Sequence, residues 1–380
     1  MSDILNVQDV SQVGEVTGLQ NGKAVIKVIG IGGGGGNTVS HMVSEKVEGV
    51  DFYVVNTDLQ ALNSNVAENK IQIGVNVTRG LGSGSNPSVG RAAAEESIEE
   101  LKDRIGPSDI TFVTAGMGGG TGTGASPIIA KINKENLKSL TVAIVTKPFS
   151  FEQKMKMKIA EEGIEELRKN VDAIVVIPND KLLKTLPEDV TLMDAFMECN
   201  RVLMKAVKGV SDIIYKEGYM NLDFNDVRAV LADSGEALIG MGTGEGETGV
   251  DDALEEAINC PLLEDVSNMV PSGIIVNVSV PDGFTLKKLA YIGQQIEAKF
   301  PTDSTVKYGV IYDSNLTKDQ ISATVLLTGL KPRENVDTIQ EESEGLELGG
   351  AFVEDVPAQS QKQTSSFGEY SLPSFLTRKG

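Results

Sequence analysis

Short apolar runs alternate with longer segments of helical period in the first half of the chain. Strands are predicted at 24–29, 52–55, 110–114, 140–145 and 173–177. Helices are predicted between them, near 38–46 and 89–104 and after 124. Alternation of this kind is typical of βαβ units and a parallel sheet. The pattern predicts a Rossmann-like α/β domain over residues 23–190.

The clearest helical stripe in the chain begins at Thr191 and ends at Lys216. Apolar side chains recur along it with helical period, at Leu192, Phe196, Leu203, Val207, Val210 and Ile214. Thr191 and Asp194 resemble a capping box, and Gly218 is a natural stop. A helix of this length spans about 39 Å, enough to cross a domain. Residues 191–218 are therefore assigned to a long central helix.

A different pattern follows the central helix. Strands are predicted at 273–280, 306–312 and 321–328, and helices near 251–259 and 286–299. The stretch 227–231 is strand-like. The glycine-rich segment 240–246 lacks a strand-to-helix setting, so we expect a flexible loop there. Residues 219–330 are predicted to form a smaller α+β domain.

The two ends of the chain lack periodic apolar residues. Residues 1–22 are interpreted as a flexible leader, and residues 331–366, rich in Glu, Gln, Ser and Lys, as a disordered linker. Residues 367–380 contain a short apolar island, Leu372–Leu376. Such an island at the end of a disordered tail is typical of a peptide that binds a partner protein. A frayed chain end is the alternative.

Charge and composition exclude several classes of protein. The net charge of −20 and the pI of about 4.6 argue against a nucleic-acid-binding protein. The two cysteines, Cys199 and Cys260, have no metal-ligand spacing, so we expect no metal site in the chain itself and a reducing compartment. No apolar run is long enough to cross a membrane, and no signal peptide is evident. The expectation is a cytoplasmic protein without membrane insertion.

The segment Gly116–Gly124 is the strongest candidate for chemistry. It follows the strand at 110–114 and precedes a helix in which Pro127 suits the first turn. Glycines let backbone N–H groups turn toward one point at a helix N-terminus, which is a site for phosphate. Two hydroxyls, of Thr121 and Thr123, can donate to phosphate oxygens. A flexible surface turn is the alternative. The candidate phosphate-binding residues are Gly120, Thr121, Gly122, Thr123 and Gly124.

A second glycine-rich segment, Gly30–Asn37, follows the first strand. Its G-x-G-x-x-G spacing, with Asp58 about 20 residues on, is also typical of a dinucleotide-binding Rossmann fold, so an NAD-dependent enzyme is an alternative. Two such segments after two strands favour one polyphosphate held from both sides. No P-loop pattern occurs in the sequence. The candidate residues are Gly33, Gly34, Gly35, Gly36 and Asn37.

Several motifs in order resemble the tubulin/FtsZ family of GTPases. The segment Gly118–Gly124 resembles the signature loop of that family, and Gly32–Asn37 and Val55–Leu62 are similar to two further loops. The resemblance extends from about Ala24 to Leu330. It implies a Rossmann-like GTPase domain that a long central helix joins to a smaller α+β domain. By the same resemblance, the loop Gly80–Pro87 senses the terminal phosphate. Without the resemblance, the simpler interpretation of this loop is a mobile surface loop.

The resemblance also implies roles for five nucleotide-binding side chains. Glu152 and Lys156 contact the nucleotide, with Lys where the family has Arg; by spacing alone they form a surface ion pair, i and i+4 on one helix. Asn179 and Asn200 hydrogen-bond the base, and Phe196 stacks on it. From helical period alone, Phe196 is a core residue.

The segment Asn221–Val227 resembles the family loop that completes the GTPase site of a neighbouring subunit. Its candidate catalytic residues are Asn221, Asp223 and Asp226, and the cofactors implied are GTP or GDP and Mg²⁺. Carboxylates can orient a water or help hold a cation, although two acids in an Asx-rich turn are the simpler interpretation.

The resemblance implies a function in cell division. The expected protein assembles with itself head to tail into filaments of the cytokinetic ring at midcell. Membrane-tether and division-regulator proteins are the expected partners of Leu372–Leu376. A filament for plasmid segregation and a non-division regulatory GTPase are the alternatives.

Overall fold

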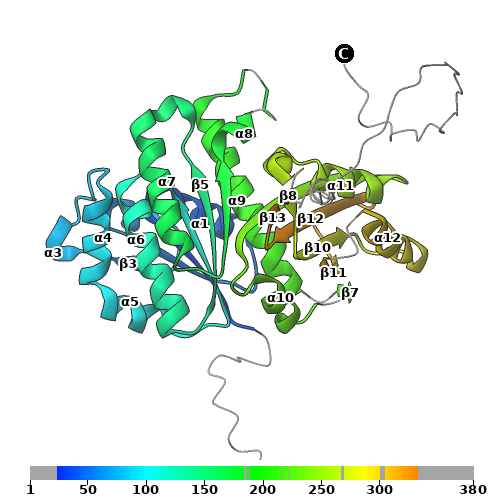
Figure 1. The fold of residues 1–380 in the computed structure, drawn as a ribbon, viewed down its shortest axis with the longest axis horizontal. Coiled ribbons are helices and arrows are strands. Elements are labelled where there is room, and N and C mark those ends of the chain that lie inside the picture. Colours follow the sequence, from blue (N-terminus) through cyan, green and yellow to red (C-terminus); the bar gives the residue numbers. More distant parts are fainter. Residues whose placement is uncertain are drawn as a thin grey trace, which may run out of the picture. The chain divides into compact units, whose positions relative to one another are not determined.

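The computed structural model describes residues 24–183, 186–187, 189–216, 218–220, 222–266, 269–299 and 304–332 (Figure 1). The leader at 1–22, the terminal peptide at 367–380 and Asn221 lie outside the described residues. The predicted linker does too, except Lys331–Pro332, which form strand β13. The described residues belong to one compact unit, so the division into domains at 190 and 219 stays a prediction.

A single sheet of eleven strands runs through the described residues, in the order β3-β2-β1-β4-β5-β6-β8-β12-β10-β11-β7. The first six strands along the chain pair with one another only in parallel. They are β1 (Ile26–Ile31), β2 (Asp51–Asn56), β3 (Asn69–Gln72), β4 (Ile110–Gly116), β5 (Leu140–Lys147) and β6 (Ala173–Pro178). The predicted parallel sheet is confirmed.

Helices lie on both faces of this parallel part. They are α1 (Gly32–Ser44), α2 (Leu59–Ser64), α3 (Val75–Thr78), α4 (Pro87–Glu96), α5 (Ile98–Ile105), α6 (Gly120–Lys131), α7 (Lys154–Arg168) and α8 (Asn179–Leu183), with short turns η1 (Ile132–Asn136) and η2 (Ser150–Glu152). Alternate strand residues enter two different core clusters: Val28 and Phe112 one, Ile29 and Val113 the other. Burial on both faces explains why these strands are continuous apolar runs in the sequence.

The sheet continues without a break into the second half of the chain. Residues Ala173–Val175 of β6 pair in parallel with Gly235–Ala237 of β8. The remaining elements are β7 (Gly218–Met220), α10 (Phe224–Leu231), β8 (Gly235–Glu245), α11 (Gly249–Ile258), η3 (Pro261–Val266), β9 (Met269–Val270), β10 (Gly273–Val280), α12 (Leu286–Lys299), β11 (Thr305–Tyr312) and β12 (Gln320–Thr328). Mixed parallel and antiparallel pairing here agrees with the α+β pattern.

The predicted central helix is confirmed as α9 (Leu192–Tyr215). The hydroxyl of Thr191 accepts a hydrogen bond from the backbone N–H of Asp194, as the capping pattern predicts. The helix packs against α1 and β5 on one side and β10 and β11 on the other. It therefore joins the two halves of the sheet.

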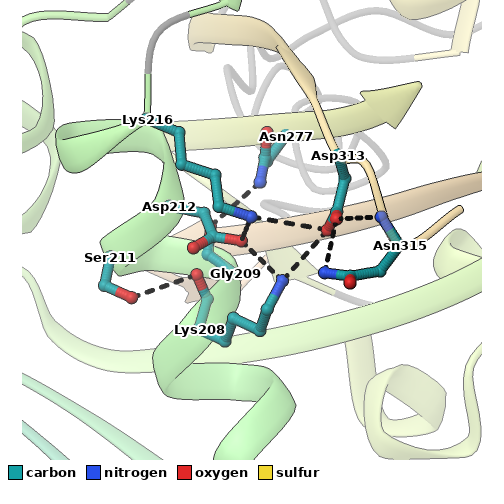
Figure 2. A network of polar contacts seen from close by, with 8 residues as sticks. All are labelled: Lys208, Gly209, Ser211, Asp212, Lys216, Asn277, Asp313 and Asn315. Atoms are coloured by element: carbon teal, nitrogen blue, oxygen red, sulfur yellow. Dashed lines mark hydrogen bonds and ion pairs between the residues drawn. The ribbon is translucent and has the colours of Figure 1, made fainter. Parts of the chain in front are cut away.

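Four charged side chains tie the end of α9 to the end of β11 (Figure 2). Lys208 lies 2.7 Å from Asp212 and 3.3 Å from Asp313. Lys216 lies 3.0 Å and 3.4 Å from the same two carboxylates. Asp313 also accepts hydrogen bonds from the backbone and side-chain N–H groups of Asn315. Each buried carboxylate thus has two lysine partners.

Two predictions for the second half were wrong. Segment 240–246 is a strand through Glu245, not a flexible loop, because its glycines let α11 lie directly on β8. A Cβ at Gly240 would lie 2.0 Å from the carbonyl oxygen of Ala257. Segment 227–231 is helical, not strand-like: Val227, Val230 and Leu231 form one buried face of α10 at spacings of three and four.

Helix boundaries in the first half also differ from the predictions. Helix α1 begins at Gly32 instead of Thr38, and α6 begins at Gly120, which places Pro127 inside the helix instead of in its first turn. Glycine disfavours helix in isolation, but a Cβ at Gly124 would lie 2.0 Å from the carbonyl oxygen of Pro87 in α4. The predicted helix 89–104 is two helices, α4 and α5, which meet at Ser97.

Candidate nucleotide site

A cavity of about 230 Å³ lies where β4, β5 and β6 end and α1 begins. Parallel α/β sheets bind ligands at this edge. The lining comes from α1 (Gly34, Asn37), the end of β4 and the residues beyond it (Gly116, Met117, Gly118, Gly119), the end of β5 and the residues beyond it (Thr146, Pro148, Glu152, Lys156), α8 (Asn179) and α9 (Phe196, Cys199, Asn200, Leu203).

Two helices begin at this cavity without a side-chain cap. Neither the N-terminus of α1 nor that of α6 has a side-chain hydrogen bond to its free N–H groups, and neither has an acid in its first turn. A Cβ at Gly35 would lie 2.3 Å from the carbonyl oxygen of Thr114, so α1 starts directly against the end of β4. Uncapped N–H groups and the helix dipoles make this a site for an anion such as phosphate.

The hydroxyls of Thr121 and Thr123 are engaged within the protein. Thr121 Oγ1 lies 2.7 Å from Thr57 Oγ1 and 3.0 Å from Ser83 Oγ. Thr123 Oγ1 accepts a hydrogen bond of 2.9 Å from the N–H of Gly118. These bonds fix the loop carrying Ser83 and the turn before α6. Donation by these hydroxyls to phosphate stays a prediction.

The other glycine candidates lie at the two helix starts but do not line the cavity. Gly33, Gly35 and Gly36 lie in the first turns of α1, and Gly120, Gly122 and Gly124 in the first turns of α6. None of these six lines the cavity, whereas Gly34 and Asn37 do. Gly35 and Gly122 pack on the end of β4, where a Cβ would lie 2.3 Å from the carbonyl oxygen of Thr114 and 2.8 Å from that of Gly116. A Cβ at Gly33 would meet nothing within 4 Å, so packing does not require a glycine there.

Glu152 and Lys156 form an ion pair of 3.2 Å on the cavity wall. The prediction that they share one helix was wrong. Glu152 ends the turn η2, and Gln153, with φ of 102°, separates it from α7. The other carboxylate oxygen of Glu152 accepts a hydrogen bond from the N–H of Phe149. The carboxylate is therefore held in place without a ligand.

Asn179 and Asn200 place two amides on the cavity wall. Asn200 Oδ1 accepts a hydrogen bond of 3.2 Å from Thr38 Oγ1. Asn179 Oδ1 is buried and has no partner in the described part of the chain. A buried acceptor without a partner costs about 1–3 kcal/mol, so it indicates a ligand with an N–H donor.

Helical period alone suggested that Phe196 is a core residue, but the structure places it at the cavity. It is 38% exposed, lines the cavity and meets Phe149 edge-on, with ring centroids 5.4 Å apart. A half-exposed ring beside two amides is suited to a planar heterocycle. The amides and the ring at one end and the helix N-termini at the other together match a nucleotide.

Several lining residues were not predicted. Thr146 and Pro148 follow from the rule that strand ends meet at one edge, and Cys199 and Leu203 lie on the face of α9 that carries Phe196. Burial, with a smaller contribution from Glu198, raises the pKa of the Cys199 thiol to about 12. This cysteine therefore lines the cavity as a neutral side chain.

The predicted catalytic acids lie apart from the cavity. Asp223 caps α10, where its Oδ1 accepts a hydrogen bond of 2.8 Å from the N–H of Asp226. Asp226 forms an ion pair of 2.8 Å with Lys307 of β11, a residue that sequence analysis did not single out. Neither acid lines the cavity. In Figure 1, α8 lies at the upper edge of the molecule and α10 at the lower edge.

Two family models match the chain. The GTPase domain of the tubulin/FtsZ family matches residues 25–187, and the C-terminal domain of the FtsZ family matches residues 235–331.

Named relatives and solved structures agree with these matches. The cell division protein FtsZ of Buchnera aphidicola (Acyrthosiphon pisum) is 47% identical over 83% of this chain and 82% of its own length. The cell division protein FtsZ of Pseudomonas aeruginosa is 44% identical over 93% of this chain and 89% of its own length. An empty FtsZ dimer from M. jannaschii superposes with a TM-score of 0.76 at 38% identity, covering 87% of this chain and 95% of that one. The chain belongs to the tubulin/FtsZ family of GTPases.

Proposed function

We propose that this protein is a cell-division GTPase that assembles head to tail, with each active site completed between two subunits. One observation carries the proposal: α8, whose Asn179 lines the cavity, and α10, at whose start the two candidate catalytic acids lie, occupy different edges of the molecule. A surface that binds at one end and a complementary surface at the other form a heterologous contact, which propagates into filaments.

The cavity supports GTP as the nucleotide. The N-termini of α1 and α6 supply N–H groups for the phosphates. Asn179 Oδ1 is a buried acceptor without a partner among the described residues, and guanine presents N–H donors on its edge. Phe196 offers a ring face to the base. GTP hydrolysis then requires water to attack the terminal phosphorus while the bond to GDP breaks, with positioning and charge stabilisation as the main contributions.

The acids of the next subunit fit the remaining task. Asp223 and Asp226 can orient the attacking water when α10 of that subunit faces the terminal phosphate. Asn221 belongs to the same segment and lies outside the described residues.

Mg²⁺ fits the same arrangement. The described residues contain no group of three metal-ligating side chains, and Glu152 is already bonded to Phe149 and Lys156. Mg²⁺ commonly binds substrate phosphates and water with only one or two carboxylates, which a nucleotide and the neighbouring acids would provide. Bound there, it would neutralise charge on the phosphates.

The proposed setting is the cytokinetic ring at midcell. The relatives named above are cell division proteins, which favours this over plasmid segregation or a dinucleotide-dependent enzyme. No helix among the described residues has the length and apolar character to cross a bilayer. Attachment of the ring would fall to tether proteins that bind the terminal peptide at Leu372–Leu376.

Turnover measured against protein concentration tests the shared site. GTP hydrolysis per molecule should be near zero below a threshold concentration and rise above it together with filament mass, measured by sedimentation. A rate per molecule that stays constant on dilution through that threshold would show that one subunit holds a complete site.

A further inference from the structure

The contact between Asp226 and Lys307 joins the candidate catalytic segment to a strand far along the chain. Lys307 lies in β11, where its backbone pairs with Ile275 of β10. Its ammonium lies 2.8 Å from Asp226 Oδ1, and the two side chains are 36% and 32% exposed. The pair is thus open to solvent on one side, where a neighbouring molecule has access.

The other contacts of Asp226 leave few alternatives for holding its carboxylate. Its N–H is bonded to Asp223, which fixes the backbone of the first turn of α10. Among the described residues, Lys307 is the charged group that lowers the pKa of Asp226, and a backbone hydrogen bond of Asp223 adds a smaller contribution in the same direction. Strand β10, which packs on α10, has no titratable side chain, and Lys147 of β5 is paired with Glu161. Lys307 is therefore the cation that orients this carboxylate.

The positive charge of Lys307 also affects how the two acids can approach a nucleotide. Two carboxylates that approach a nucleotide triphosphate and have no cation beside them would repel it. The ammonium of Lys307 is bonded to one acid, and the negative charge of Asp223 also contributes to raising the pKa of Lys307, after the larger effect of Asp226. The segment consequently presents two acids and one cation instead of two acids alone.

We propose that Lys307 is a positioning residue for GTP hydrolysis: it holds the carboxylate of Asp226 for the water at the neighbouring subunit's nucleotide and offsets its repulsion from the phosphates. The inference rests on the proposed function, because it requires Asp226 to act on the next subunit. An exposed ion pair adds little to the stability of a fold, so a role in catalysis is where its loss should show.

The test compares Lys307→Met, which removes the charge at similar length, with Lys307→Arg, which keeps it. Lys318→Met is the matched control, because Lys318 is an exposed lysine in the same half of the chain and lies in a loop before β12. Turnover is measured per sedimented subunit at saturating GTP and across a pH series, so that changes in filament mass do not enter the rate.

Lys307→Met should lower turnover per assembled subunit by roughly three- to tenfold, a fraction of what loss of a general base costs. The Lys307 contact lowers the pKa of Asp226, so its removal should also move the acidic limb of the pH profile to higher pH. Lys307→Arg keeps the charge, so its turnover and its pH profile should be close to those of the wild type. Lys318→Met should match the wild type in both. Affinity for GTP should not change, because Lys307 does not line the cavity of its own chain.

The outcomes separate this inference from the proposed function. Asp226→Asn measured beside it should abolish turnover; if it does and Lys307→Met keeps both the wild-type rate and the wild-type pH profile, the role of Lys307 is refuted and the shared site stands. Turnover that survives Asp226→Asn would refute the proposed function itself. Loss of filaments by Lys307→Met, with an unchanged melting temperature, would also overturn the inference, since Lys307 would then be an assembly contact.

Discussion

Lys208 and Asp313 meet at 3.3 Å although 105 residues separate them in the sequence. Lys208 lies on the central helix and Asp313 directly follows β11 (Figure 2). The Asp313 side chain is only 8% exposed, and two lysines and the N–H groups of Asn315 surround it. The contact fixes one end of α9 to the sheet of the second half.

Asp313→Asn should therefore destabilise the protein. The substitution keeps the size of the side chain but leaves Lys208 and Lys216 with Asp212 as their shared carboxylate. Losing one partner from a largely buried ionic network should lower the free energy of unfolding by roughly 1–3 kcal/mol, less than a fully buried pair because both lysines reach solvent. Urea unfolding of Asp313→Asn and of the exposed control Asp319→Asn measures the difference. Equal midpoints for the two variants would contradict the prediction.

The same network predicts how the effect depends on pH. Burial alone would raise the pKa of Asp313, but the Asn315 N–H and the two lysines outweigh it and the pKa is lowered. A lowered pKa in the folded state means stability that is present above the unfolded pKa of about 3.9 and lost as pH falls through the folded value. The advantage of the wild type over Asp313→Asn should thus be constant near neutral pH and shrink below about pH 4. An advantage that instead shrinks between pH 7 and 5 would point to a different group.

Apolar pattern predicted most of the fold because the core selects the same residues that the pattern shows. Strands β10 and β12 and helix α12 lie where their apolar residues indicate. The pattern was misleading at Gly240–Gly246, where only the position of α11 shows why glycines belong in a strand. Local propensity reflects only neighbours in the sequence, so it cannot predict that α11 packs on this strand and requires glycines in it.

The candidate site was predictable to the extent that its residues follow strand ends. Asn179 comes directly after β6, and Gly116–Gly119 lie at the end of β4 and just after it, so topology places them together. The bond between Thr121 and Thr57, and the pair of Asp226 with Lys307, join segments distant in sequence. No spacing in one sequence reveals such contacts, which depend on how the elements pack.

Asn179→Leu should change nucleotide binding and apo stability in opposite ways. Leucine has a similar size and removes the buried oxygen that has no partner among the described residues, so the nucleotide-free protein should be no less stable. The GTP complex loses one hydrogen bond, which should weaken binding by roughly tenfold. Melting temperatures with and without GTP measure both effects, with Asn63→Leu on the exposed face of α2 as the control. Destabilisation of the apo protein with unchanged GTP affinity would remove Asn179 from the site.

A mixture of two inactive variants should recover activity if the site is shared. Gly119→Glu places a carboxylate at the phosphate end of the cavity; Gly119 has φ of −89°, and a Cβ there meets nothing within 4 Å, so the variant should fold but bind GTP poorly. Asp226→Asn keeps the cavity and loses the acid. Each variant alone should be nearly inactive. An equimolar mixture should regain roughly a quarter of wild-type turnover, because both required subunits must occupy a junction in the right order.

Gly119→Ala is the control for that mixture, since it adds a Cβ without charge and should hydrolyse GTP nearly as the wild type does. Activity of the mixture should also require the concentration at which filaments sediment. If the mixture only reproduces the sum of the two separate rates while both proteins enter the same filaments, the cavity of one subunit and Asp226 of the next do not act together. In that case the role of Asp226 would be structural, in the first turn of α10 and in the ion pair with Lys307.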